Sequence, residues 1–284
     1  MIDQCATRLR FVFHAHNVML EEVAKYRAAR ALWARLMRDD YGAQSEAAQK
    51  LRFHAQTAGC TLHAQQPEVN LIRVACQALA AVLGGCQSLH TNSMDETLAL
   101  PSEHAVTLAL RTQQVLAHET GIAQVVDPLG GSYCVESLTR ELQAAARDYF
   151  DRIAAEGGML AAIENGFFRR EIAQSAYQEQ ARIDRGEQII VGVNAFQQAD
   201  ERPLPTHGVD PSAESAQREA LLRIRRQRSA AEVRAALDDL RRAAEDGTNV
   251  FVPLLAAAEA RVTVQEAMDA LADVFGRYRI AGGW

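Results

Sequence analysis

The chain has 284 residues, of which 48% are hydrophobic, and a formal net charge of −6. This is enough for one or two domains with a real core, and the composition excludes wholesale disorder. The mild acidity disfavours a nucleic-acid partner, and neither a bilayer-spanning apolar stretch nor an N-terminal signal core is present, so we expect a cytoplasmic protein without a membrane partner.

Strand and helix patterns alternate in the first part of the chain. Residues 8–14 alternate in polarity and are rich in Phe and Val, which predicts a strand. Asn17 is the expected N-cap of the long amphipathic helix that follows. The expected strands are 8–14, 50–58 and 86–91, and the expected helices are 18–40, 69–83 and 102–119. This order predicts a parallel sheet, either in a barrel or in an open doubly wound sheet.

No phosphate-binding glycine loop joins any of these strands to its helix, which disfavours a nucleotide-binding sheet. The remainder of the chain reads mainly as helix from Glu136 onward. The apolar run 188–193 is consistent with a lone strand, and residues 197–212 are polar and proline-rich, as in a linker. Residues 213–279 predict amphipathic helices broken at Gly247 and Pro253.

The cysteines are odd in number and show no C-x-x-C spacing, which predicts free thiols in a reducing compartment. They are Cys5, Cys60, Cys76, Cys86 and Cys134. His14 and His16 share one side of a strand pattern, but two histidines alone are a weak metal signal. We therefore expect no metal site.

Polar, neutral side chains stand at the carboxyl ends of the expected strands, at 14–17, 54–59 and 88–93. In a (β/α) barrel, the active site lies at the carboxyl ends of the strands. Within the second strand, Phe53 and Ala55 share one face and His54 and Gln56 share the other. Fully buried parallel strands are normally apolar on both faces, so the polar face indicates either a lumen that holds a ligand or a face open to solvent.

Two residue pairs are candidates for ligand contacts. The planar donors of Arg8 and Arg10 suit phosphates, although the residues alone favour a solvated strand edge. Asn92 and Glu96 lie four apart across a strand-to-helix turn and suit a ribose or an amide, although Glu96 also suits the N-terminus of a helix. No Ser-His-Asp order or paired acid/base carboxylates stand out, which gives hydrolysis little support.

Four stretches between Arg8 and Asn194 resemble the methylmalonyl-CoA mutase family. They are LRFHAQTAG, QALAAVLGGCQSLHTNSMDETLALP, VDPLGGSY and GEQIIVGVN. The resemblance implies a (β/α) barrel threaded by acyl-CoA and capped by adenosylcobalamin, whose cobalt–carbon bond breaks to give the radical that starts the rearrangement. The expected fold is therefore α/β, a partial (β/α)8 TIM barrel of about three βα units followed by a mostly helical C-terminal region. The expected divisions are 1–134 for the barrel, 135–196 for its helical extension, 197–212 for the linker and 213–284 for the helical tail.

The resemblance also implies ligand-contacting positions. Those for acyl-CoA are Arg8, Arg10, His54, Gln56, Gln87 and Ser88, although relatives often carry Ser where this chain has Arg10. Those for adenosylcobalamin are Gly84 and Gly85 beneath the corrin, and Asn92 and Glu96 at the adenosyl ribose.

The resemblance also implies a catalytic strand and a cobalt ligand that are not found in these residues. The family's strand with a Tyr-His pair beside the substrate would precede residue 1, and no D-x-H-x-x-G cobalt-ligand motif occurs in the sequence. We therefore expect no residue of that catalytic pair here, and a partner chain or domain that supplies the missing strands and the cobalt ligand. The leading hypothesis is an isomerase component, converting methylmalonyl-CoA to succinyl-CoA by family frequency and incomplete on its own. The alternatives are a non-catalytic, partner-binding half-barrel of a mutase complex and an unrelated α/β ligand-binding protein.

Overall fold

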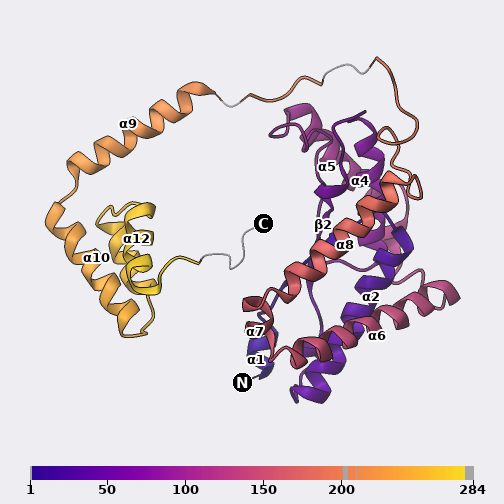
Figure 1. Ribbon diagram of the computed structural model, residues 1–284, viewed down its shortest axis with the longest axis horizontal. Helices are drawn as coiled ribbons and strands as arrows, with labels where there is room; N and C mark the ends of the chain where they lie inside the picture. Colours follow the sequence, from indigo (N-terminus) through magenta and orange to yellow (C-terminus); the bar gives the residue numbers. More distant parts are fainter. Residues whose placement is uncertain (1, 201–203, 209, 279–284) are drawn as a thin grey trace. The chain divides into compact units, whose positions relative to one another are not determined.

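The computed structural model describes residues 2–200, 204–208 and 210–278. They belong to two compact units, Met1–Gly208 and Val209–Trp284, which are described separately below (Figure 1).

The first unit is built on a parallel sheet of three strands in the order β1-β2-β3, namely β1 (Phe11–Ala15), β2 (Phe53–Thr57) and β3 (Ser88–His90). Helix α2 (Met19–Arg35) connects the first two strands, and helix α4 (Val69–Leu83) connects the second pair. The predicted α/β architecture with a parallel sheet is confirmed. Three strands are consistent with part of a barrel, and barrel closure is not seen among the described residues.

One face of the sheet packs against helices α2 and α4. Phe53 and Ala55 of β2 point to this face, where Tyr26 of α2 stacks on the Phe53 ring at a centroid distance of 5.0 Å. Gly84, which ends α4, packs against the Tyr26 ring so closely that a side chain at this position would overlap it. The other face is open, and Val12 in its middle is 66% exposed. Apolar residues therefore anchor one side of the sheet and leave the polar side uncovered.

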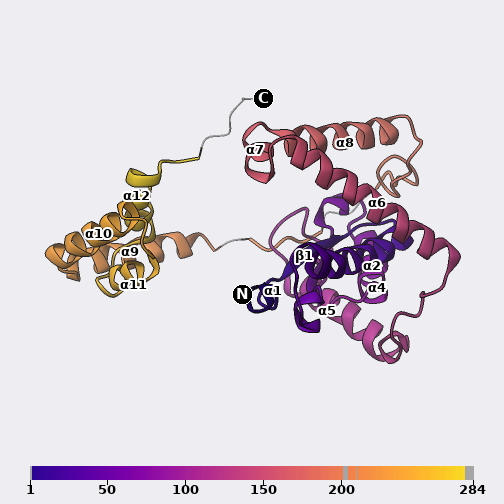
Figure 2. The same cartoon turned by 90° about the horizontal axis from the view of Figure 1, so that it is seen from below.

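The remaining helices of this unit surround the α2–α4 layer. They are α1 (Ile2–Ala6), α3 (Glu46–Gln49), α5 (Glu103–His118), α6 (Tyr133–Ala155), α7 (Met159–Glu164) and α8 (Phe167–Asp184). Helix α6 lies along α2, where Val135 is buried against Val23 of α2 and Ala80 of α4 (Figure 2). The helix predicted at 69–83 is confirmed without a shift, and Ser102 caps α5 by accepting a hydrogen bond from the Ala105 N–H at 3.2 Å.

Three local predictions are wrong for identifiable reasons. The first strand begins at Phe11, because α1 and the turn after it occupy the residues up to Arg10. Asn17 does not cap α2: its Oδ1 accepts a hydrogen bond from Gln77 Nε2 at 2.6 Å, and Val18 takes the N-cap position. The run 188–193 is a turn with a single bridge from Val191 to Ala195 rather than a strand.

The second unit consists of four helices, counted over the part of 209–284 that the structure describes. They are α9 (Pro211–Gln227), α10 (Ala230–Glu245), α11 (Phe251–Glu259) and α12 (Val264–Phe275). The break expected at Gly247 is confirmed, whereas the break at Pro253 is wrong. Pro253 lies in the first turn of α11, where its missing N–H removes no helical hydrogen bond. Helix α9 begins at Pro211, within the predicted linker 197–212, of which 201–203 and 209 lie outside the described residues.

One ion pair joins the two ends of this helical unit. Arg228 at the end of α9 donates two hydrogen bonds of 2.6 Å to the carboxylate of Glu266 in α12. The same carboxylate accepts the Thr263 N–H at 2.9 Å in a capping box. The Arg228 guanidinium is the largest cause that lowers the pKa of Glu266 to about 2.

We expect the variant Arg228→Gln to destabilise the helical unit by about 1–2 kcal/mol at neutral pH, since the pair is charge-assisted but partly exposed. The Glu266 pKa is depressed in the folded state. Its contribution is therefore present above the ordinary pKa of 4.5 and is lost as the pH falls toward about 2. Thermal unfolding followed by circular dichroism at neutral and acidic pH measures both effects. Arg223→Gln on the exposed side of α9 is the matched control, and equal acid sensitivity in Arg228→Gln and the unmodified chain would contradict the expectation.

Candidate functional site

The open face of the sheet carries two rows of side chains that run across the strands. The parallel register places Val12, His54 and Ser88 in one row and His14, Gln56 and His90 in the next. His54 Nδ1 and Ser88 Oγ share a hydrogen bond of 2.7 Å. The structure thus brings together three residues predicted to contact acyl-CoA, namely His54, Gln56 and Ser88, on one solvent-facing surface.

Asn92 lies just beyond the carboxyl end of β3 and is 1% exposed. Its backbone N–H donates to Thr57 Oγ1 at 2.9 Å, and its side-chain Nδ2 donates to the Thr57 carbonyl at 2.9 Å. Its Oδ1 accepts a hydrogen bond from Gln56 Nε2 at 3.2 Å. Both ends of the Asn92 amide are therefore used within the protein, and one of them orients Gln56 on the open face.

The carboxylate of Glu96 lies over Gly59, which follows β2. A Cβ at Gly59 would stand 2.7 Å from Glu96 Oε1 and 3.1 Å from Asn92 Nδ2, so the absence of a side chain there leaves room for both groups. Burial raises the pKa of Glu96, and the charge of Asp95 raises it further, while His90 opposes the shift. No side-chain hydrogen bond or ion pair of Glu96 is found within the described residues, so its oxygens are available to a ligand that donates hydrogen bonds.

Gln77 of α4 holds the loops at the carboxyl ends of β1 and β2, a role that sequence reasoning missed. Its side chain is completely buried. Gln77 Oε1 accepts the Ala58 N–H at 3.0 Å, and its Nε2 donates to Asn17 Oδ1 at 2.6 Å and to Thr61 Oγ1 at 2.7 Å. One amide thus fixes three loop positions relative to each other.

Asn70, near the start of α4, fixes other loop residues in the same way. It is completely buried, its Oδ1 accepts the His63 N–H at 3.1 Å, and its Nδ2 donates to the carbonyls of His63 and Met94 at 2.9 and 3.0 Å. Asn70 and Gln77 are seven residues apart in a helix whose other residues, except Arg73, are apolar or Cys, and this spacing places both on one face. This spacing was the available signal for a buried polar network.

Several other predicted site residues lie at the amino end of the sheet. Arg8 and Arg10 precede β1, and Arg10 Nη1 donates to the carbonyls of Thr7 and Leu9 at 2.8 and 2.7 Å. Gln87 precedes β3, and its Oε1 accepts the Phe53 N–H at 2.7 Å. The structure therefore gives Arg10 and Gln87 local backbone partners, in addition to any ligand contact.

Gly84 and Gly85 also precede β3, whereas Asn92 and Glu96 follow it. The structure thus separates the residues assigned to one cofactor between opposite ends of this strand. Neighbouring residues explain why glycine occurs at both positions. Gly84 packs on Tyr26, and Gly85 has φ +83° and lies against the Arg30 guanidinium. Their contact with a corrin stays a prediction.

A hollow of about 690 Å³ flanks the carboxyl ends of β1 and β2 between α4 and α8. Its wall includes Asn17, Cys60 and Thr61, which belong to the loops fixed by Gln77.

Among the residues that the structure describes, no three histidine, cysteine or acidic side chains gather closely enough to hold a metal ion. No described helix combines the length and apolarity needed to cross a membrane.

Comparison with known proteins gives one consistent result. The family model described as methylmalonyl-CoA mutase matches residues 1–277. The chain is 40% identical over 280 residues to the 2-hydroxyisobutanoyl-CoA mutase large subunit of Aquincola tertiaricarbonis, covering 98% of this chain and 50% of that protein. It is 42% identical to the methylmalonyl-CoA mutase of Rhizobium meliloti and 40% identical to the methylmalonyl-CoA mutase large subunit of Propionibacterium freudenreichii, covering 98% of this chain and 39% of each relative. The chain therefore spans half or less of the length of these relatives.

Proposed function

This chain belongs to the methylmalonyl-CoA mutase family, and from that premise we propose that it forms the carboxyl-side part of the catalytic barrel of an adenosylcobalamin-dependent acyl-CoA mutase. The proposed reaction is the rearrangement of methylmalonyl-CoA to succinyl-CoA. The observation that carries the proposal is the open polar face of the sheet, where His54, Gln56 and Ser88 stand in two adjacent rows.

The acyl-CoA chain would lie along this face. His54 and Gln56 alternate with the buried Phe53 and Ala55, so a ligand on the open side meets hydrogen-bonding groups while the other side stays packed. Asn92 holds Gln56, and Ser88 holds His54, which fixes the directions of both side chains before a substrate arrives. At the amino end of the same sheet, Arg8 and Arg10 would receive the CoA phosphates.

The residues at the carboxyl end fit the adenosyl ribose. Glu96 offers carboxylate oxygens that have no side-chain partner within the described part of the chain, and Gly59 leaves space beside them. Vicinal ribose hydroxyls are donors, and hydrogen bonds to a carboxylate are among the stronger ones in proteins. Bound adenosylcobalamin would supply the radical that begins the rearrangement. The chain's own contribution would be to hold the ribose at Glu96, beside the buried Asn92 that fixes Gln56, and the acyl chain along the sheet.

We further propose that the remaining barrel strands, the Tyr-His pair and the cobalt ligand come from sequence outside these residues, in the same or another protein. Two of the relatives compared above are large subunits, and this chain spans 39–50% of the length of the three. The free cysteines suit the reducing cytoplasm, where we place the protein. Because the relatives are named as mutases, the non-catalytic half-barrel is the less favoured alternative.

The test is mutase turnover with methylmalonyl-CoA and adenosylcobalamin. We expect turnover when this chain is combined with a protein that carries the missing strands and the cobalamin-binding domain, and none with either component alone. The same assay with 2-hydroxyisobutanoyl-CoA checks the identity of the substrate. Faster turnover of that compound would show that it, and not methylmalonyl-CoA, is the substrate. Absence of CoA and adenosylcobalamin binding in every assembly would overturn the proposal in favour of a non-catalytic module.

A further inference from the structure

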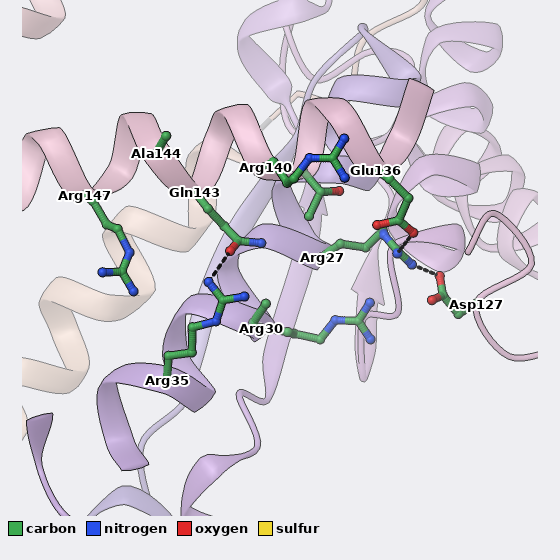
Figure 3. A pocket seen from close by; sticks show the side chains of 11 residues that line it. Arg27, Arg30, Arg35, Asp127, Glu136, Arg140, Gln143, Ala144 and Arg147 are labelled. Carbon is green, nitrogen blue, oxygen red and sulfur yellow. Dashed lines mark hydrogen bonds and ion pairs between the residues drawn. The ribbon is translucent and has the colours of Figure 1, made fainter. Parts of the chain in front are cut away.

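A groove rich in arginine lies between helices α2 and α6, on the helical side of the sheet (Figure 3). Its volume is about 840 Å³. The charged side chains that line it are Arg27, Arg30, Arg35, Arg140, Arg147, Asp127 and Glu136. Five positive and two negative groups therefore meet in one groove of a chain whose formal net charge is −6.

Both carboxylates of the groove are paired with the same arginine. Arg27 donates through Nη2 to Glu136 Oε1 at 2.5 Å and through Nη1 to Asp127 Oδ1. Arg35 donates to the neutral amide of Gln143 at 3.0 Å and has no ion pair within the described residues. Both carboxylates therefore form their ion pairs with Arg27, and the charge of Asp127 acts on Arg30 without an ion pair or hydrogen bond between them.

Three guanidiniums have no hydrogen bond or ion pair to any residue that the structure describes. They are those of Arg30, Arg140 and Arg147. Arg30 is half-buried, its Nε is fully buried without a partner, and burial lowers the pKa of its guanidinium. A desolvated cation without a partner destabilises a protein, so an external anion at this point would remove a real deficit.

Local backbone geometry makes room for the Arg30 guanidinium. A Cβ on Gly85 would stand 2.7 Å from Arg30 Nη1. The glycine before β3 therefore permits the head of Arg30 to lie against the chain, in the groove rather than in bulk water. Figure 3 shows Arg30 and Arg35 reaching from α2 below α6, the helix that carries Arg147.

We propose that this groove binds a ligand with a diphosphate or longer phosphate chain. The planar guanidinium matches two phosphate oxygens at once, which favours phosphate over a simple monovalent anion. Arg140 and Arg147 are two helical turns apart, about 10 Å along α6, a spacing that suits an extended anion with more than one phosphate group. The site faces away from His54 and Gln56 and goes beyond the mutase function proposed above.

The experiment is calorimetric titration of the full chain with inorganic pyrophosphate at low ionic strength. We expect one bound pyrophosphate per chain and an affinity that falls steeply with added salt. The double variant Arg140→Gln/Arg147→Gln should weaken binding about 10-fold or more, since each lost charge-assisted contact corresponds to roughly that factor. Both side chains are exposed, so folding is preserved, which circular dichroism verifies.

The control Arg223→Gln/Arg226→Gln removes the same charge from exposed positions of α9 and should leave the affinity unchanged. No binding of pyrophosphate, or equal weakening by the two double variants, would overturn the proposal. Titration with CoA identifies the source of the phosphate chain. Weakening of both ligands by the groove variant assigns the groove to the diphosphate of CoA, and weakening of pyrophosphate alone assigns it to another phosphate ligand. Since no turnover is measured, the result is independent of the proposed mutase activity.

Discussion

The variant Gln77→Ala should lower the free energy of unfolding of the first unit by about 3 kcal/mol. The substitution removes three hydrogen bonds made by a completely buried side chain, while the Ala58 N–H keeps its second acceptor, the Ala15 carbonyl, at 2.9 Å. Each lost hydrogen bond contributes about 0.5–1.5 kcal/mol to stability, and the space vacated by the amide adds to this. Urea unfolding at equilibrium, followed by far-ultraviolet circular dichroism, measures the change.

Gln178→Ala is the matched control, because Gln178 is an exposed residue of helix α8 in the same unit. Its effect should stay within about 0.5 kcal/mol. A loss below about 1 kcal/mol for Gln77→Ala would show that water replaces the amide, and that the loops after β1 and β2 do not depend on it.

The variant Glu96→Gln should reduce turnover by the assembled mutase about 10- to 100-fold, through weaker binding of adenosylcobalamin. The substitution keeps the size of the side chain but removes the charge that strengthens hydrogen bonds from ribose hydroxyls, a difference of about 1.5–3 kcal/mol. Because burial raises the pKa of Glu96, protonation begins at a higher pH than for an ordinary glutamate. Cofactor affinity should therefore fall as the pH drops through that raised pKa, and this dependence should vanish in Glu96→Gln.

Two further variants distinguish ribose binding by Glu96 from the general effect of removing a negative charge. Glu103→Gln, at an exposed position at the start of α5, removes the same charge and should leave cofactor affinity unchanged. Gly59→Ala should imitate Glu96→Gln, since its methyl group would stand 2.7 Å from Glu96 Oε1 and displace a flexible carboxylate. Unchanged adenosylcobalamin affinity in Glu96→Gln, with the other parts of the mutase present, would contradict the assignment of the ribose to this residue.

Periodicity was sufficient to predict the fold class. The alternation of strand and helix patterns predicted a parallel sheet, and the helix at 69–83 was placed without error because its apolar positions repeat along a buried face. The polar face of β2 was also readable from the sequence, as His54 and Gln56 alternate with Phe53 and Ala55. Strand ends were less accurate, since the turn after α1 displaces the start of β1 to Phe11.

The parts that could not be predicted depend on contacts between distant residues. Asn17 has the chemistry of an N-cap, but Gln77, sixty residues away, takes its oxygen. Gly84 and Gly85 read as an approach site for a ligand, while the structure fills the space beside them with Tyr26 and Arg30. The spacing of Asn70 and Gln77 indicates that both lie on one helix face, but it does not indicate which distant residues they bond, so the partners of Gln77 appear only once the chain is folded.

The position of the sheet along the chain bears on how the protein is synthesised. All three strands lie between Phe11 and His90, ahead of helices α6 to α12. At a translation rate of about 5–20 residues per second, roughly 6–24 seconds pass between the synthesis of His90 and that of the helical unit after residue 208. The polar face of the sheet can therefore assemble on the ribosome before the helical unit has been made. Val23 and Ala80, which pack against Val135, stay uncovered until α6 (Tyr133–Ala155) has been made.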